Sequence, residues 1–263
     1  MPLPRITFRD IQTREILFYD PDLTEACFQY CQDRNLDCMP SLNDPSKFNR
    51  KTETGFCEES VPPERMIDGH EFIFAKQLLD RFRAHNLLFV YQETELTGVV
   101  HFSDYNRPSV NAYLFNLLSA YERSLRKVLS LSGLNNRDML NYFTKMIVSS
   151  DNKLIKHVYS EKLRGFEKNK ARYEKLHDFD RFPLKDLIDL AKHHHIICLS
   201  EKVIDLRNMV MHAQELVNIE DAGREDFIYD FSSFEKFFIQ VDILLHDYKK
   251  ANNLISFKEL ERA

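Results

Sequence analysis

The sequence predicts an α+β protein, with a mixed α/β part over residues 1–107 and an all-α bundle over residues 108–263. In the first part, apolar runs of strand length flank a short polar turn. From Pro108 onward, apolar residues recur at the three- and four-residue spacing of helices. With 21 Phe and 11 Tyr in 263 residues, the chain has the material for a packed interior. We therefore expect two folded domains that meet near Arg107 and Pro108.

The first part contains two similar helix-then-strand units. In the later unit, residues 71–79 have the pattern of an amphipathic helix, and residues 87–91 and 98–102 have the pattern of a hairpin. In the earlier unit, residues 22–27 open a helix, and residues 35–40 follow where a strand is expected. Two such tandem units predict an internally duplicated domain.

The second part is predicted to be helical throughout. A long helix over residues 110–129 is stopped by Gly133, because glycine readily ends helices. The expected later helices span 136–149, 153–177, a short stretch from Pro183, one that begins at Ser200, and 227–245. Because helices joined by short connections pack as antiparallel neighbours, an antiparallel bundle is the expected architecture.

Composition excludes several classes of protein. The six glycines form no phosphate-binding loop, and no apolar run reaches the length of about 18 residues that a membrane span needs. The amino terminus lacks a signal segment, so we expect a cytoplasmic protein with no membrane partner. The cysteine spacing, including Cys27 and Cys31, does not match a structural zinc site, and the consecutive residues His193 to His195 diverge on a helix. No metal site is therefore expected.

Charge is distributed unevenly along the chain. The whole chain has a net charge of -5, and residues 1–108 alone have -6, whereas residues 121–175 have +7. An overall acidic chain argues against a nucleic-acid partner, but the basic stretch 121–175 could contact phosphates. A solvated helix face is the alternative interpretation of such a stretch. RNA is therefore compatible with the second part of the chain.

The segment Gly98–Asp104, Gly-Val-Val-His-Phe-Ser-Asp, ends the predicted hairpin with a strand-then-turn pattern. This pattern resembles that of the CBS-pair family, in which two helix-strand units enclose a cleft for adenosine nucleotides. The resemblance implies a regulatory domain over residues 1–107, with Asp104 binding ribose hydroxyls and His101 at the neighbouring position of the nucleotide site. The alternative is that Asp104 caps the helix that follows it.

The most informative pattern of the second part lies in the helix that begins at Ser200. On a helical wheel, an apolar stripe forms the buried face, and Asn208 and His212 point away from it. Arg207 and Met211 lie between the two faces. The members of the stripe are Val203, Leu206, Val210, Ala213 and Val217. The polar residues are therefore presented outward, toward a partner.

Arg207, Asn208 and His212 form the motif R-N-x-x-x-H. The bare spacing of Arg and His also occurs at Arg65 and Arg172, so the Asn and the late helix supply the specificity. This combination resembles the HEPN superfamily (higher eukaryotes and prokaryotes nucleotide-binding), whose motif forms a ribonuclease site in a dimer. The likeness covers about residues 108–250, and Glu122 matches an acidic residue that often faces the motif in that family.

These residue types suit metal-independent RNA cleavage, in which a 2′-hydroxyl attacks the adjacent phosphate. A histidine can exchange protons near neutral pH, and an arginine presents donors matched to phosphate oxygens. Asn208 can orient the imidazole or the phosphate without adding charge. We therefore expect Arg207, Asn208 and His212 to be catalytic, with no cofactor.

The predicted protein is an endoribonuclease of the toxin or phage-defence type. It is expected to cleave RNA as a homodimer, and its expected regulators are an adenine nucleotide bound by the first domain and an antitoxin or inhibitor protein. The alternative is a non-catalytic, nucleotide-sensing dimeric binding module.

Overall fold

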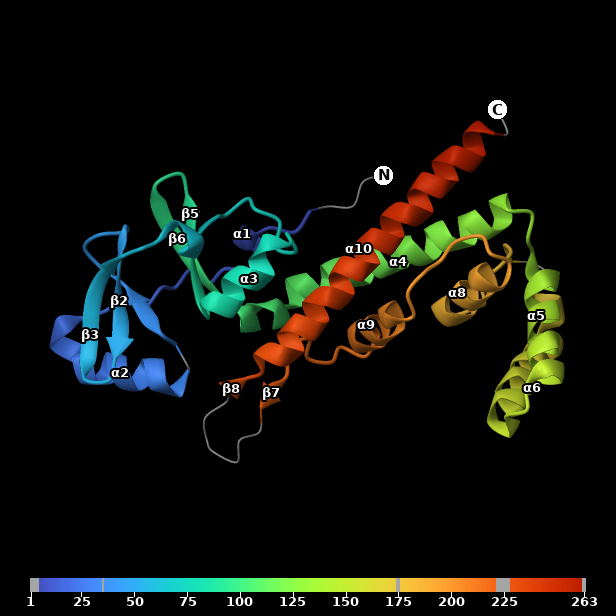
Figure 1. Ribbon diagram of the computed structural model, residues 1–263, viewed down its shortest axis with the longest axis horizontal. Helices are drawn as coiled ribbons and strands as arrows, with labels where there is room; N and C mark the ends of the chain where they lie inside the picture. Colours follow the sequence, from blue (N-terminus) through green and yellow to red (C-terminus); the bar gives the residue numbers. More distant parts are fainter. Residues whose placement is uncertain (1–4, 35, 174–175, 221–227, 262–263) are drawn as a thin grey trace. The chain divides into compact units, whose positions relative to one another are not determined.

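The computed structural model describes residues 5–34, 36–173, 176–220 and 228–261. Strands and short helices come first along the chain and long helices follow, so the predicted α+β class and its order are confirmed (Figure 1). The chain divides into two compact units. The first unit comprises Met1–Asn116 and Asn208–Asp242, and the second comprises Leu117–Arg207 and Ile243–Ala263.

The predicted boundary at Arg107 and Pro108 coincides with the first residue of helix α4 (Pro108–Leu131). The division into compact units falls later, between Asn116 and Leu117, because α4 continues from one unit into the other. Helix α10 (Phe231–Leu260) does the same. Membership of the CBS-pair family and of the HEPN superfamily stays a prediction for both parts.

The first unit contains two three-stranded sheets. One is an antiparallel meander of β1 (Cys38–Pro40), β2 (Lys47–Thr52) and β3 (Gly55–Ser60). In the other, β4 (Met66–Asp68) runs parallel to β5 (Leu87–Gln92), which forms a hairpin with β6 (Glu95–His101). The hairpin is confirmed. The two sheets differ in topology, so the predicted internal duplication is wrong. Asn35, the first residue of the segment expected to follow the earlier helix, lies outside the described residues.

The shorter elements of the first unit are α1 (Phe8–Ile11), η1 (Pro21–Leu23), α2 (Thr24–Asp33), η2 (Pro63–Arg65), α3 (Gln77–Ala84) and η3 (Phe102–Asn106), with the two-residue strands β7 (Ile219–Glu220) and β8 (Ile228–Tyr229). The helix predicted to open within residues 22–27 is confirmed by α2. The helix predicted over 71–79 is wrong for its first six residues, since α3 begins at Gln77. The backbone of 71–73 is instead bonded to the N-terminal segment: Phe8 N donates to Glu71 O (3.3 Å) and Ile73 N to Ile6 O (3.4 Å).

Aromatic rings form the core where the later segment of the first unit packs on the earlier one. The ring centroid of Phe234, on α10, lies 5.0 Å from that of Tyr105 and 5.5 Å from that of Phe82. Asn106 adds three hydrogen bonds, since its Oδ1 accepts from Leu216 N and Val217 N and its Nδ2 donates to Val217 O, each at 2.8 Å. The segment that follows α9 is thereby fixed to the N-terminal part of the chain.

The second unit is helical. Besides parts of α4 and α10 it contains α5 (Asn136–Ser149), α6 (Lys153–Lys168), α7 (Lys170–Tyr173), α8 (Leu184–His193) and most of α9 (Lys202–Met211). The helix predicted over 153–177 is interrupted at Asn169, whose backbone leaves the helical region and whose Nδ2 donates to Gly165 O (2.8 Å). Residues 174 and 175 lie outside the described residues. Phe227, the expected first residue of the last helix, also lies outside the described residues. The last helix, α10, extends to Leu260 rather than to Leu245.

The antiparallel arrangement is confirmed for one pair of helices and wrong for another. Phe143 of α5 packs on Tyr159 of α6, with 5.4 Å between ring centroids. Each residue lies in the middle of its helix, at a similar distance from the turn that joins the two, so α5 and α6 form an antiparallel pair. In contrast, Ser124 bonds to Asn252 (3.3 Å) and Lys127 pairs with Glu259 (2.6 Å), so α4 and α10 advance in the same direction. They run parallel because the chain returns through α5 to α9 between them.

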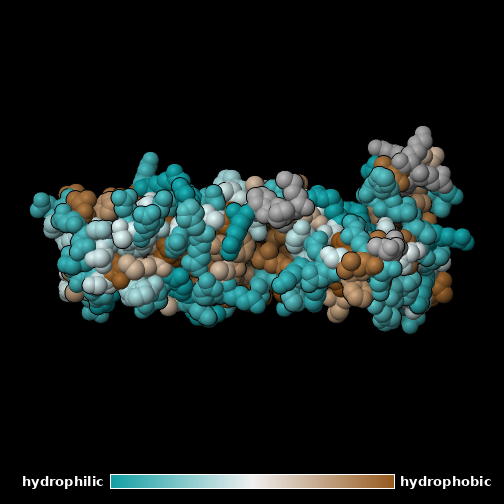
Figure 2. All heavy atoms as spheres, turned by 90° about the horizontal axis from the view of Figure 1, so that it is seen from above, coloured by the Kyte–Doolittle hydropathy of each residue, from teal (hydrophilic) through white to brown (hydrophobic). Residues whose placement is uncertain are grey.

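On the face shown in Figure 2, hydrophilic residues predominate and apolar residues lie in separate groups among them. No helix within the described ranges combines the length and the apolar character needed to cross a lipid bilayer.

Candidate functional site

Helix α9 carries the R-N-x-x-x-H motif, and its local sequence explains why it forms. Lys202 N donates to Ser200 Oγ (3.3 Å) at the start of the helix, and Ser200 N donates to Asp247 Oδ2 (2.8 Å). The expected apolar stripe is buried at Val203, Leu206 and Val210, which are at most 4% exposed. The two hydrogen bonds fix the start of α9, and the buried apolar stripe packs one face of the helix into the core.

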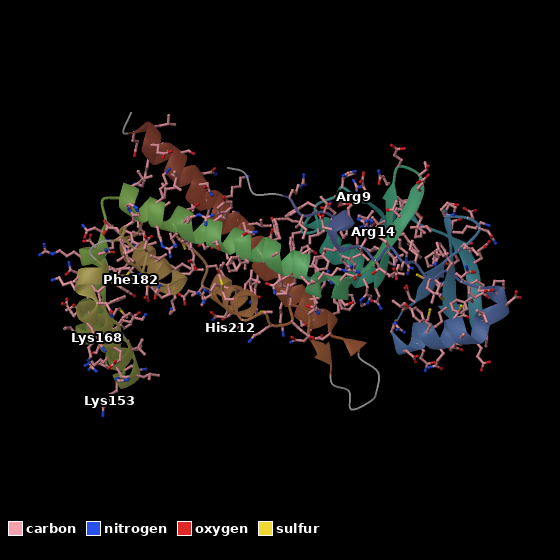
Figure 3. All side chains as sticks on the ribbon, turned by 180° about the vertical axis from the view of Figure 1, so that it is seen from behind. Arg9, Arg14, Lys153, Lys168, Phe182 and His212 are labelled. Carbon is pink, nitrogen blue, oxygen red and sulfur yellow. The ribbon has the colours of Figure 1, made fainter. Side chains whose placement is uncertain are left out.

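The other face of α9 has the exposure that the helical wheel predicts. Asn208 and His212 are exposed, whereas Arg207 and Met211 are partly buried. The stripe prediction is wrong at Ala213, which is exposed because α9 ends at Met211 and Ala213 turns the chain with a φ of 49°. Arg207 and Asn208 are thus consecutive residues of α9, and His212 directly follows its last residue, as Figure 3 shows for His212.

Glu122, the acidic residue that the resemblance implies, lies beside Arg207. The Arg207 Nε lies 3.9 Å from Glu122 Oε1, and the Arg126 guanidinium donates to Glu122 Oε2 (3.3 Å). The three side chains are 32%, 16% and 20% exposed, in the order Arg207, Glu122, Arg126. Two guanidinium groups thus share one largely buried carboxylate, and the cluster retains one net positive charge.

Arg126 also connects this cluster to the chain ahead of α8. Its Nε donates to Phe179 O (3.2 Å) and its terminal nitrogen to Phe182 O (3.5 Å). These bonds connect Glu122, through Arg126, to the loop that precedes α8. Sequence reasoning did not single out Arg126, although its position one helical turn after Glu122 was a usable signal.

The backbone around His212 is fixed on both sides. His212 N donates to Asn208 O (3.1 Å), and Gln214 N donates to Met209 O (3.0 Å), which closes the end of α9. Two residues later, Leu216 and Val217 are held by Asn106. His212 therefore projects from a well-anchored turn with its side chain exposed to solvent.

The residues proposed for nucleotide binding form a local cap. Asp104 Oδ2 accepts from His101 N (2.8 Å), and Asp104 Oδ1 accepts from two nitrogens of Arg107 at 2.9 and 2.8 Å. Ser103 N donates to His101 Nδ1 (3.2 Å), and burial lowers the pKa of His101 to about 4, so its ring is neutral. Asp104 thus caps η3, the short helix in which it lies, rather than a helix that follows it. The nucleotide role of Asp104 and His101 stays a prediction.

A cavity of about 460 Å³ in the first unit lies elsewhere and was missed by the sequence reasoning. Its apolar wall includes Met66, Ile67 and Tyr91, and its rim includes the carboxylates of Asp68 and Glu93. Tyr91 donates through its hydroxyl to Pro45 O (2.6 Å), which closes one side. Asp68 ends β4 directly beside Tyr91 of β5, so a polar residue at the end of an apolar strand was the available signal.

The cysteines are chiefly packing residues. Cys27, Cys31 and Cys38 are buried, and burial raises the pKa of Cys31 to about 11 and that of Cys38 further, so both are thiols at neutral pH. Across the described residues, no three His, Cys, Asp or Glu side chains are grouped so that they could hold a metal ion.

Comparison of the chain with protein-family models, with curated proteins and with solved structures finds no match.

Proposed function

We propose that the chain is a metal-independent endoribonuclease, of the toxin or defence type, that cleaves RNA as a homodimer. The observation that carries this proposal is the state of the motif on α9: Arg207 is held by Glu122 while Asn208 and His212 are exposed. Residues that only filled the core would not leave an imidazole and an amide open to solvent. Within the proposal, the domain of residues 1–107 regulates the enzyme in response to a nucleotide or an inhibitor protein.

In the proposed reaction, the RNA 2′-oxygen forms a bond to the adjacent phosphorus, and the bond from phosphorus to the 5′-oxygen breaks. His212 accepts the proton of the 2′-hydroxyl, and His212 of a second copy donates a proton to the leaving 5′-oxygen. Arg207 stabilises the charge on the crowded phosphate, and Glu122 fixes the orientation of its guanidinium. Asn208 can orient either the imidazole or the phosphate. The products are a 2′,3′-cyclic phosphate and a 5′-hydroxyl.

The decisive variant is His212→Ala. We expect it to lower the cleavage rate about a thousandfold, because general acid–base groups typically contribute a factor of about 10² to 10⁴. The control is His70→Ala, since His70 is also exposed and follows an arginine at the same spacing. Sedimentation of both variants should show an unchanged dimer. Full activity in His212→Ala would refute the proposal.

A second candidate, a non-catalytic dimeric sensor of adenosine compounds, is favoured by the 460 Å³ cavity of the first unit. Its volume lies within the usual range for small ligands. Asp68 and Glu93 can accept hydrogen bonds from ribose hydroxyls but repel phosphates, so adenosine should bind better than its nucleotides. Tight adenosine binding by calorimetry, together with no RNA turnover at any enzyme concentration, would establish this function in place of the nuclease.

A further inference from the structure

A second cavity, of about 220 Å³, lies within the helical unit where α6 meets the start of α8. Its aromatic wall is formed by Phe143, Phe166 and Phe182, and its polar groups belong to Lys162, Arg181 and Asp186. Figure 3 places Phe182 near the end of α6 that carries Lys168, away from Lys153. No part of the R-N-x-x-x-H motif lines this cavity.

The aromatic wall consists of three buried phenylalanines, at most 8% exposed, that pack on one another. Phe166 and Phe182 are nearly parallel, with an angle of 6° between ring planes and 5.9 Å between centroids. Phe143 meets Phe182 edge-on, at 76° and 5.8 Å. Planar heterocycles stack on such rings, and unpaired RNA bases are commonly bound in this way.

The polar groups make the cavity more than an apolar recess. Asp186 is almost wholly buried, with a side chain 2% exposed, and its Oδ1 accepts a hydrogen bond from Lys162 Nζ. The Lys162 ammonium also lies over the rings of Phe143 (5.3 Å) and Tyr159 (4.9 Å). Arg181 is exposed at the rim. A carboxylate accepts hydrogen bonds through two oxygens, so Asp186 can serve Lys162 and a ligand N–H together.

We propose that this cavity binds one unpaired base of the RNA substrate. The base stacks on the phenylalanine rings, donates an N–H to Asp186, and leaves its phosphate near Arg181 and Lys162. A volume of about 220 Å³ holds a single base rather than a dinucleotide. This inference rests on the proposed ribonuclease function, which it deepens by giving the enzyme a base-recognition pocket.

The cavity is joined to the candidate catalytic cluster through Arg126. Phe182, whose ring lines the cavity, offers its carbonyl oxygen to Arg126 (3.5 Å), and Arg126 donates to Glu122 (3.3 Å), which pairs with Arg207. A base seated against Phe182 therefore contacts the same loop whose carbonyl groups bond Arg126. Base recognition and the cluster of Arg126, Glu122 and Arg207 are thereby adjacent.

Gly165 supplies a clean test because it lines the cavity and a Cβ added there meets no atom within 4 Å. The variant Gly165→Leu should fill the cavity without disturbing the core, and Gly165→Ala is the matched control. The probes are 2′-O-methyl RNA heptamers, which lack the attacking hydroxyl, and a heptamer of the same backbone without bases. Binding to the full chain is measured by fluorescence anisotropy at one salt concentration.

We expect wild type and Gly165→Ala to prefer the base-containing heptamers by about tenfold, as stacking of one base predicts. Gly165→Leu should lose most of that preference and retain the phosphate-dependent binding. An unchanged preference in Gly165→Leu, or no preference in wild type, would overturn the pocket. Anisotropy measures binding and does not depend on cleavage. A wild-type chain that prefers base-containing RNA but never cleaves RNA would therefore refute the ribonuclease function and support the base-binding cavity.

Discussion

Glu122 is the carboxylate that pairs with both Arg207 and Arg126. Its carboxylate is 16% exposed and separates two guanidinium groups. We expect Glu122→Gln to lower the free energy of unfolding by about 2 kcal/mol, because two like charges then face each other with no anion between them. Urea denaturation measures this change.

The matched control for that prediction is Glu161→Gln. Glu161 pairs with Arg164 on the surface of α6, and both side chains are about half or more exposed (47% and 74%). Exposed pairs contribute less than about 1 kcal/mol, so this variant should unfold almost as wild type does. Equal losses in the two variants would show that Glu122 has no special role.

His101 predicts a dependence of stability on pH. Burial lowers its pKa from 6.5 to about 4 in the folded chain, so the unfolded chain binds more protons between these values. The stability that the neutral ring contributes is present above pH 6.5 and is lost as the pH falls toward 4. At pH 5 the loss is about 2 kcal/mol.

Comparison with His101→Asn isolates this effect, since asparagine can accept the bond from Ser103 N without titrating. Urea denaturation of both proteins at pH 7.5 and pH 5 should show the additional loss in wild type alone. The same loss in the variant would assign the pH dependence to other groups.

At the scale of elements, the start of α5 depends on a reciprocal cap. Asn135 Oδ1 accepts from Arg137 N (2.8 Å), and Asp138 Oδ2 accepts from Asn135 N (2.9 Å). We expect Asn135→Ala to cost about 1 kcal/mol of unfolding free energy, since loss of such a cap leaves helix N–H groups unpaired. Asn141→Ala, at an exposed position inside α5, should cost nothing. Thermal unfolding distinguishes them, and equal costs would contradict the role of the cap.

The sequence predicts elements well where local pattern and tertiary packing agree. The apolar stripe of α9, the helix α5 over 136–149 and the hairpin of β5 and β6 are all visible as local patterns in the sequence. Prediction fails where the backbone of a segment forms hydrogen bonds with a segment that is distant in sequence. Residues 71–73 have a helical pattern, but they bond to the N-terminal segment, and no local rule reveals that contact.

The candidate site was predictable to a similar extent. Arg207, Asn208 and His212 are identified by their motif, and Glu122 is implied by the family resemblance. The structure brings Glu122 within 3.9 Å of Arg207, while the catalytic roles stay predictions. The alternative that Asp104 caps a following helix misplaces the cap, since the bond from His101 N shows that Asp104 caps η3. The cavity lined by Asp68 has one local signal, the polar residue at the end of an apolar strand, whereas the cavity of the helical unit has none, because its lining comes from three separate segments.

At the scale of the whole molecule, the uneven charge matters more than the net charge. The chain carries -5 in total, but residues 121–175 carry +7, and they include α6, whose Lys153, Lys156 and Lys168 are exposed. Phosphate contacts in this stretch would make RNA binding weaken steeply with salt. An acidic total therefore does not exclude an RNA substrate.

Cleavage of RNA by its own 2′-hydroxyl without a metal ion leaves a chemical record at the ends of the fragments. We expect the purified chain in excess chelator to produce fragments with 2′,3′-cyclic phosphate and 5′-hydroxyl ends, at the same rate as without chelator. Fragments with 3′-hydroxyl and 5′-phosphate ends, or no fragments at all, would refute the proposed ribonuclease.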